Sequence, residues 1–391
     1  MPIKFPIFSR IKVWMRFSLG QAFLFCALVL VMVAQDNENK SDPAKNSVAL
    51  EALSRLEGMD LEANPGVKAA VLRVLEKTRG TSDFVEIVKK FKLPGQSPGL
   101  LDVALKNPSS ESGVEAMRMI LASGDLALAQ SALHGTNAFD AAHAAEALGN
   151  LKEKQTIPIL LPLVTNLSRA VPVRKAAVRG LAQTSDGADT LLQLARADRL
   201  PDDLKFVAGT ELNAARWPEV KNAAAKILPL PQGQNAQSLP PLAELLKMKG
   251  DVAAGEKVFL REQSACSTCH KVRGRGGEVG PDLTEIGGKL GKDALTEAVL
   301  DPSAGISMGF ESWHLELKSG DDAYGLLSSD TADEIAIKDS KGIVTRYKKS
   351  NVLKREQSKL SIMPAGLQMT MTAQEFVDLI EFLASLKKPS N

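Results

Sequence analysis

The chain has 391 residues, a length that suggests two or three domains, and 44% of them are hydrophobic, which is enough to bury substantial cores. Aromatic residues make up only 5%, while alanine and leucine are abundant, so helices packed on helices are favoured over a large β-sandwich or propeller. The net charge is +2 and becomes −2 without the four basic residues of the first 34, so the charge gives no support for nucleic-acid binding.

The first 34 residues have the pattern of an export signal. An apolar run, FSLGQAFLFCALVLVMVA, fills residues 17–34, and no acidic residue occurs within it or before it. Four basic residues precede the run: Lys4, Arg10, Lys12 and Arg16. We expect residues 1–34 to be a signal peptide or a signal anchor, because 18 residues are a marginal length for a membrane span and MVA is a poor cleavage site. Either form directs the protein to the periplasm or to the outer face of the cytoplasmic membrane. The polar residues 35–46 then form a tether.

Residues 47–228 show the spacing of helical repeats. AAEALGN (144–150) and AVRGLAQ (177–183) are related at a spacing of 33 residues, and AGTELNA (208–214) follows after another 31. Each lies in an apolar pattern of helical period, and polar segments such as TSDGADT (184–190) are expected to be loops between the helices. Paired helices at such a period are typical of an α-solenoid, and this part resembles degenerate HEAT repeats. An irregular helical bundle is the alternative.

Residues 229–241 are predicted to be a linker. Four prolines cannot propagate a helix, and the polar residues between them have nothing to bury. We expect a moderately stiff connection between the helical repeats and the remainder of the chain.

The residues CSTCH, 266–270, carry the clearest chemical signal in the chain. Only three cysteines occur, and Cys26 lies in the apolar leader, so no second cysteine pair can complete a four-thiolate zinc site. Cysteines at i and i+3 lie on one face of a helical turn, so Cys266 and Cys269 can both bond to the vinyl groups of one haem, with His270 placed to ligate the iron. A mixed zinc site and a redox CxxC are the alternatives. The first lacks a spaced histidine pair, and the second normally opens a helix that follows a strand.

A helix is predicted on each side of this motif. The segment DVAAGEKVFLREQSA runs up to it and is amphipathic, with Asp251 as the N-cap. Late in the chain, Met363 stands beside a proline in a loop, and a helix then begins with Thr372 and Glu375 at the capping-box spacing. Two such helices could cross over a haem edge and close its pocket.

Further short stretches occur in a recognisable order: GEKVF before the haem motif, VGPDLTEIG after it, then LDPSAGI, and MPAGL leading into LIEFLASL. With them, residues 246–388 resemble the cytochrome c-type haem-binding domain found widely in secreted proteins of planctomycetes and verrucomicrobia. The resemblance implies one covalent haem c per chain, with His270 as proximal and Met363 as distal iron ligand. It also implies that Pro281 packs near the proximal histidine and that its backbone oxygen orients the imidazole. Haem c attachment outside the cytoplasmic membrane agrees with the export signal.

Other side chains compete with Met363 for the sixth position on the iron: Met308, Met369, Met371 and His314. We favour Met363 because it alone combines a loop position, an adjoining proline and a following helix.

The separation of the two expected ligands indicates an insertion. His270 and Met363 are 93 residues apart, roughly twice the separation in a compact single-domain cytochrome. Within residues 310–358, the stretches WHLEL, AYGLL, EIAIK and IVTRY read as strands separated by turns. We therefore expect a small antiparallel β unit inserted in a cytochrome c domain made of residues 242–309 and 359–388.

The sequence thus predicts a multidomain, mainly α protein, with an N-terminal HEAT-like α-solenoid and a C-terminal cytochrome c-type helical domain that carries a small antiparallel β insertion. The expected function is that of an exported monohaem electron carrier, not an enzyme, whose helical arm docks a redox partner. A separate secreted dehydrogenase is the candidate partner, because the resembled domain is often joined to a sugar-dehydrogenase-like propeller that this chain lacks. Two alternatives are a haem enzyme or subunit of a dehydrogenase complex, which a six-coordinate haem disfavours, and a helical scaffold with a structural or sensory haem.

Overall fold

The computed structural model describes residues 51–229 except 52, 54 and 57, and then residues 239–261 and 264–388. The chain divides into two compact units, residues 1–99 and 100–391. The predicted leader, tether and most of the linker, together with Cys26, lie outside the described residues. Across the described ranges, no helix is both long enough and apolar enough to cross a membrane.

The first unit contains two amphipathic helices, α3 (Pro65–Lys77) and α4 (Ser82–Phe91), which pack against each other. Proline is well suited to the first position of α3, because the amide that it lacks would have no partner inside the helix. The ring of Phe84 is fully buried. A Cβ atom on Gly99 would lie 2.3 Å from Cζ of this ring, so the Gly99 backbone packs directly against it.

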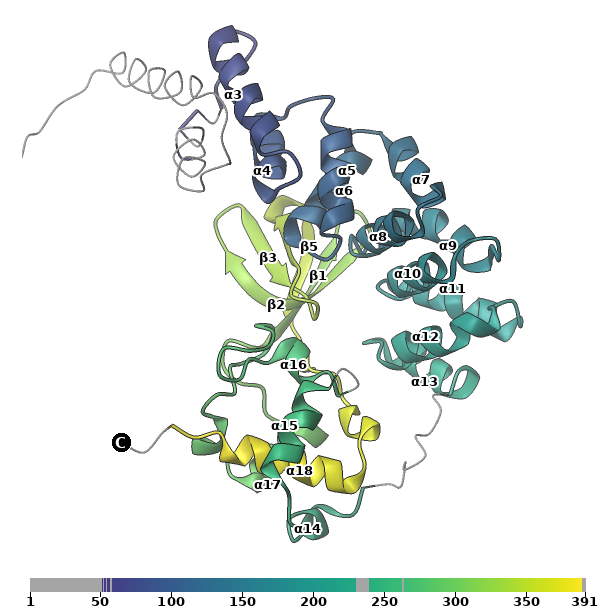
Figure 1. Ribbon diagram of the computed structural model, residues 1–391, viewed down its shortest axis with the longest axis vertical. Helices are drawn as coiled ribbons and strands as arrows, with labels where there is room; N and C mark the ends of the chain where they lie inside the picture. Colours follow the sequence, from purple (N-terminus) through teal and green to yellow (C-terminus); the bar gives the residue numbers. More distant parts are fainter. Residues whose placement is uncertain are drawn as a thin grey trace, which may run out of the picture. The chain divides into compact units, whose positions relative to one another are not determined.

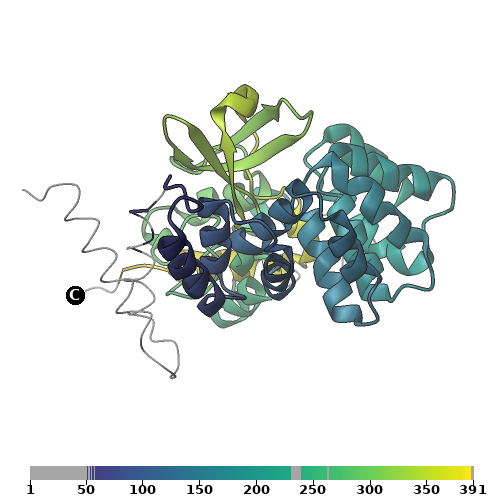
Figure 2. The same cartoon turned by 90° about the horizontal axis from the view of Figure 1, so that it is seen from above.

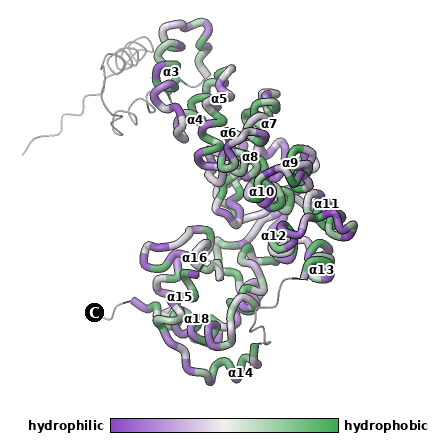
Figure 3. The backbone as a smooth tube through the Cα atoms, turned by 45° about the vertical axis from the view of Figure 1, so that its right-hand side comes forward, coloured by the Kyte–Doolittle hydropathy of each residue, from purple (hydrophilic) through white to green (hydrophobic). Residues whose placement is uncertain are grey.

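A succession of helices, which we call the helical region, starts at the boundary between the two units and continues through the first part of the second unit. Their bounds are α5 (Ser97–Lys106), α6 (Glu111–Ala122), α7 (Leu126–His134), α8 (Ala138–Gly149), η1 (Lys154–Thr156), α9 (Ile157–Thr165), α10 (Val171–Leu181), α11 (Ser185–Arg196), α12 (Asp202–Asn213) and α13 (Pro218–Ile227). Helix α10 packs against α8 and α12, and α11 packs against α13 (Figures 1 and 2). Hydrophobic and hydrophilic residues alternate along these helices (Figure 3). Packing between alternate helices is compatible with a repeat array, but the identity of the repeats as HEAT-like stays a prediction.

The prediction of a loop at residues 184–190, in the helical region, is wrong. The polar stretch TSDGADT does not separate helices, because α11 begins at Ser185 and includes most of it. The Thr184 side chain accepts a hydrogen bond from the backbone N–H of Gly187 at 3.1 Å, which makes Thr184 the N-cap of the helix. Threonine and aspartate favour helix starts for the same reason that they favour turns, since their side chains bond to nearby backbone groups.

Helices α8 and α10 approach each other at a pair of glycines. A Cβ atom on Gly149 would lie 2.3 Å from Cα of Gly180, and a Cβ on Gly180 would lie 2.9 Å from Cα of Gly149. The two backbones therefore touch at a place where no side chain fits.

The C-terminal helices surround a core of their own. They are α14 (Leu242–Leu245), α15 (Val252–Leu260), α16 (Cys266–Cys269), η3 (Ile286–Gly288), α17 (Lys292–Leu300), η5 (Leu367–Thr370) and α18 (Ala373–Ser385). Helices α15 and α18 cross as the sequence suggested (Figure 1), with the Phe259 and Phe382 rings 5.6 Å apart. Both predicted caps are confirmed: Asp251 accepts from the Ala254 amide, and the capping box at the start of α18 is complete.

A five-stranded antiparallel sheet is inserted between α17 and α18. Its strands are β1 (Ser312–Leu317), β2 (Asp322–Asp330), β3 (Glu334–Lys338), β4 (Val344–Lys348) and β5 (Val352–Gln357), in the order β4-β3-β2-β1-β5. The short turn η4 (Lys349–Asn351) leads into the last strand. The small antiparallel unit is confirmed with all four predicted strands. Strand β5 was missed, because most of its side chains are exposed and three successive residues are charged, as suits an edge strand.

Candidate functional site

The two cysteines of the CSTCH motif lie on one helical turn. Helix α16 consists of Cys266–Cys269, and the His270 amide closes the turn by donating to the Cys266 carbonyl at 3.0 Å. Both thiols are free and half-buried. This is the arrangement that lets two sulfurs approach one planar group from the same side.

The thiols differ from those of a redox dithiol. Burial raises the pKa of both Cys266 and Cys269 above the ordinary value for a thiol. A redox CxxC works through a thiolate with a lowered pKa. The electrostatic environment here favours the protonated thiol and so does not support the redox alternative.

The imidazole of His270 is oriented by a backbone carbonyl. Its Nδ1 atom lies 2.9 Å from the oxygen of Pro281. Because a carbonyl oxygen can only accept, Nδ1 carries the proton and Nε2 keeps its lone pair for a metal. Burial lowers the pKa of His270, although the bond to Pro281 acts in the opposite direction. The ring is therefore held in the neutral form that ligates iron.

A glycine-containing loop closes around the motif. The amides of Val279 and Gly280 both donate to the Cys269 carbonyl, at 3.0 and 2.8 Å. A Cβ on Gly280 would lie 2.4 Å from Cε1 of His270, so this position has room for hydrogen only. The loop presses directly on the imidazole face.

The turn between β3 and β4 also touches the motif. The thiol of Cys269 lies 3.8 Å from the Ser340 carbonyl oxygen, a weak sulfur contact, and Lys338 donates to the Glu278 carbonyl at 3.2 Å. The sequence predicted the turn DSKG itself but not its contact with Cys269, because nothing local in this segment indicates which distant residues it meets.

Cys266, Cys269, His270 and Pro281 thus come together in one short part of the chain, whereas Met363 belongs to a separate loop. Met363 is half-buried, and its amide donates to the Ser361 hydroxyl at 3.2 Å.

The competing side chains have different environments. Met308 and Met369 are largely exposed, and Met371 is buried among core side chains. His314, on β1, lies between carboxylates, with Nε2 3.3 Å from Asp322 and Nδ1 3.7 Å from Glu356.

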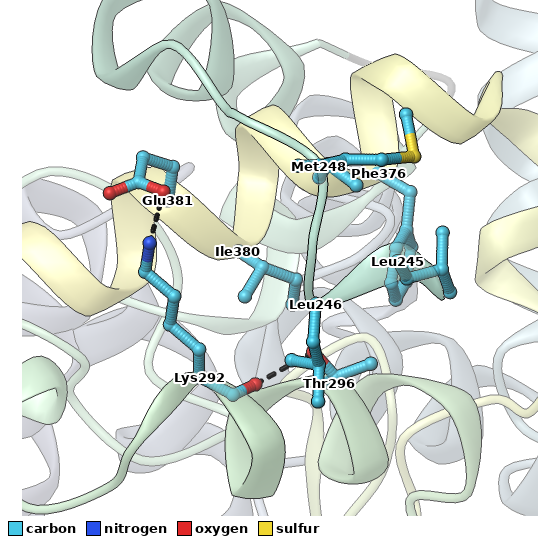
Figure 4. A pocket seen from close by; sticks show the side chains of 9 residues that line it. Leu245, Leu246, Met248, Lys292, Thr296, Phe376, Ile380 and Glu381 are labelled. Atoms are coloured by element: carbon cyan, nitrogen blue, oxygen red, sulfur yellow. Dashed lines mark hydrogen bonds and ion pairs between the residues drawn. The ribbon is translucent and has the colours of Figure 1, made fainter. Parts of the chain in front are cut away.

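Two hollows adjoin the C-terminal part. The first, of about 10 Å³, is too small for more than one water molecule. Figure 4 shows Leu245, Phe376 and Ile380 around it, with Lys292 paired to Glu381 at its edge. The second is an open cavity of about 380 Å³, lined by Arg216, three side chains of the sheet and residues 357–360. In the ranges that the structure describes, no three His, Cys, Asp or Glu side chains converge as a metal site, which gives no support to a mixed zinc site.

A family model described as Cytochrome c matches residues 252–336. No curated protein matches the sequence significantly. The matched range includes α15, the CSTCH motif and Pro281, and it ends within the sheet, before Met363. The chain therefore carries a C-terminal cytochrome c domain, and such a domain implies covalently bound haem c. The residues fit that group, since both thiols are free, they share one turn, and the neighbouring imidazole has Nε2 available.

Proposed function

We propose that the protein is an exported monohaem c-type cytochrome that carries single electrons, and that its haem domain is of the planctomycete and verrucomicrobial type. The observation that carries the proposal is the CSTCH turn, with two free thiols on one face and a histidine fixed through Nδ1. Haem c supplies the one-electron chemistry, since its iron alternates between Fe(III) and Fe(II). The chain supplies attachment, orientation and exclusion of water, and we assign it no catalytic residue of its own.

Each residue of the site has a separate task in this proposal. Cys266 and Cys269 form the thioether bonds, His270 is the proximal ligand, and Pro281 fixes the imidazole through its carbonyl oxygen. Met363 is the distal ligand. Its half-buried loop position supports this choice, because Met308 and Met369 are exposed to solvent and the Met371 thioether is enclosed by core side chains. A thioether ligand stabilises reduced iron and raises the potential, as suits an electron acceptor.

The test is expression of the chain with a cytochrome c maturation system. We expect the haem to stay with the protein through denaturing electrophoresis, and to be lost when Cys266 and Cys269 are both replaced by alanine. Cys26→Ala is the control and should keep the haem, because this cysteine lies in the leader. Haem that washes out of the unaltered protein in denaturant, or zinc in its place, would refute the assignment.

The distal ligand has its own test. Met363→Ala should abolish the weak far-red charge-transfer band of the ferric protein and lower its potential, while the haem stays covalently attached. Met369→Ala is the matched control, because this methionine is exposed and close in sequence. A band that survives Met363→Ala would assign the ligand to another side chain.

The location of the protein follows from the leader in this proposal. Residues 1–34 export the chain, and residues 17–34 tether it to the membrane where the leader is not cleaved. Cell fractionation should find the haem protein in the periplasm or on the outer face of the cytoplasmic membrane. Haem protein found only in the cytoplasm would contradict export.

The helical region is proposed to dock the redox partner, for which a separate secreted dehydrogenase is the candidate. Support comes from Phe139 on α8 and Phe206 on α12, large apolar side chains that are 66% and 67% exposed on two helices packed against α10. Such side chains often anchor protein interfaces. Tethering would then keep the haem at high effective concentration near a docked donor.

Docking is tested by replacing both Phe139 and Phe206 with serine. We expect slower reduction by the physiological donor and unchanged reduction by ascorbate, a small molecule that needs no docking. Leu353→Ser is the control, because Leu353 is 65% exposed but lies on β5. Equal rates for the double variant and the unaltered protein at low donor concentration would remove the docking role from this surface.

A further inference from the structure

The segment that leads to Met363 is attached to the sheet by two hydroxyl groups. We call residues 358–363, which follow β5, the methionine strap. The carbonyl oxygen of Leu360 accepts from the Tyr324 hydroxyl at 3.0 Å and from the Ser312 hydroxyl at 2.5 Å. The two hydroxyls are themselves 2.8 Å apart. One carbonyl of the strap is thus held from two neighbouring strands.

Two further hydrogen bonds anchor the strap on either side of Leu360: the Ser358 amide donates to the Ser312 carbonyl at 2.8 Å, and the Ser361 amide donates to the Ser303 hydroxyl at 3.1 Å. On one side the strap borders the cavity of about 380 Å³, which residues 358–360 help to line. Lys359 and Leu360 are exposed, so at Leu360 itself the strap is held mainly by the hydrogen bonds from Tyr324 and Ser312. Ser312 is fully buried and both residues belong to paired strands, so the donors are rigidly placed.

A change at Leu360 reaches Met363 over a short distance. Met363 is three positions after Leu360, and three extended residues span at most about 11 Å. Ser361 joins the two: its amide donates to the hydroxyl of Ser303, outside the strap, and its own hydroxyl accepts from the Met363 amide. A displaced Leu360 would therefore pull on the turn that presents the thioether.

The ring of Tyr324 is held in turn by the helical region. The guanidinium of Arg216, from the connection between α12 and α13, lies 5.1 Å from the Tyr324 ring and 4.5 Å from the Trp217 ring. Arg216 also forms an ion pair with Asp322, the first residue of β2. The side chain is enclosed enough that burial lowers its pKa to about 10. Arg216 thus connects the helical region to the strand that carries Tyr324.

We propose that Tyr324 and Ser312 are positioning residues for the distal ligand, and that Arg216 couples the helical region to them. The inference rests on the proposed function, in which Met363 binds the iron. In this view the inserted sheet holds the methionine strap in place and so affects how firmly Met363 binds the iron. It also gives the helical region an influence on the haem that does not depend on a docked partner.

The test compares two tyrosine variants of the full-length haem protein. Tyr324→Phe removes the donor to Leu360 and keeps the ring beneath Arg216. Tyr347→Phe is the matched control, because Tyr347 lies on β4, at the opposite edge of the sheet from β5, where its hydroxyl bonds to Thr345. The main readout is the affinity of the ferric protein for imidazole, which must displace the distal ligand. The far-red band and the midpoint potential are measured alongside.

For Tyr324→Phe we expect imidazole to bind about fivefold more tightly, as for the loss of one net hydrogen bond, with a weaker far-red band and a lower potential. Tyr347→Phe should stay within about twofold of the unaltered protein. The double variant Ser312→Ala/Tyr324→Phe should exceed the single one, because Leu360 then loses both donors. Arg216→Met should shift imidazole affinity in the same direction as Tyr324→Phe, by a smaller factor.

The outcomes separate this inference from the proposed function. If Met363→Ala leaves the far-red band intact, the ligand assignment fails and the inference falls with it. If Met363→Ala abolishes the band but the double variant binds imidazole like the unaltered protein, only the inference is overturned. A response to Tyr324→Phe without any response to Arg216→Met would limit the positioning role to the sheet and overturn the coupling.

Discussion

The carboxylate of Asp339 in the β3–β4 turn is paired with the ammonium group of Lys152, between α8 and η1, at 2.5 Å. The Asp339 side chain is only 7% exposed, and its other oxygen accepts from the amides of Lys341 and Ile343. Lys341 in turn donates to the Asn150 side chain at 2.9 Å. Since the same turn touches Cys269, one buried carboxylate joins the helical region to the segment that holds the haem.

Replacing Lys152 by methionine should therefore be costly. Asp339 keeps two backbone N–H donors and the charge of Lys341 but loses its ammonium partner, and the loss of a hydrogen bond to a charged group costs about 1.5–3 kcal/mol of the free energy of unfolding. Urea unfolding measures the change. Lys154→Met is the control, because Lys154 pairs with Asp186 at the surface and should cost less than about 1 kcal/mol. Equal losses of unfolding free energy in the two variants would show that the pair with Asp339 stabilises the fold no more than the surface pair does.

A methyl group at Gly280 should disturb the proximal histidine without detaching the haem. The added Cβ would lie 2.4 Å from the His270 ring, so the ring or the loop must move and the bond to the Pro281 oxygen must weaken. In Gly280→Ala we expect covalent haem in normal yield, a shifted absorption spectrum and a changed midpoint potential. Gly288→Ala is the control, since nothing lies within 4 Å of a Cβ at that position. Identical spectra for both variants would mean that the loop moves to accommodate the methyl group and leaves the His270 ring in place.

Glu375, at the start of α18, should make the free energy of unfolding depend on pH. Burial tends to raise the pKa of Glu375, but hydrogen bonds from the Thr372 amide and the Arg261 guanidinium outweigh it and leave that pKa below its ordinary value. A carboxyl group whose pKa is lower in the folded state stabilises the fold above its unfolded pKa, and this contribution is lost as pH falls through the folded pKa.

We therefore expect Glu375→Gln to flatten the fall of the unfolding free energy between about pH 5 and pH 3, where an ordinary glutamate titrates. Glutamine keeps the capping geometry but has no charge to lose. Denaturant unfolding at several pH values measures the slope, and parallel curves for the two proteins would contradict the prediction.

The contact between α8 and α10 should tolerate no added side chain. Gly149→Ala would place Cβ 2.3 Å from Gly180, so the helices must separate, at a cost of about 1–3 kcal/mol typical of overpacking. Gly66→Ala, in α3 with nothing within 4 Å, should be neutral or slightly stabilising, because alanine favours helix. Thermal unfolding of the two variants measures the difference, and two equally stable variants would show that the glycine contact is loose.

What the sequence predicted well was encoded locally. The CSTCH motif was readable because attachment of one haem requires a fixed spacing of Cys266, Cys269 and His270. The start of α18 could be predicted because the capping box depends only on the residue types at positions 372 and 375, Thr372 and Glu375. The four predicted strands alternate apolar and polar residues, whereas β5 is an exposed edge strand without that pattern.

What the sequence could not predict depends on distant pairs. Lys152 and Asp339 are 187 residues apart, and Arg216 and Asp322 are 106 apart, so neither member of a pair indicates its partner. The attachment of the methionine strap to Tyr324 is of the same kind. Its donors lie on strands whose place next to the strap follows only from the folded sheet.

The raised pKa values of the two thiols have a consequence for the chain before it receives its haem. Oxidation by peroxide and exchange with other disulfides both proceed through the thiolate. Since burial raises the pKa of Cys266 and Cys269 and so lowers the thiolate fraction of each, a chain that folded ahead of haem attachment would react more slowly with oxidants than one with exposed thiols. The local fold would then slow the oxidation of both sulfurs during the time before their thioether bonds are formed.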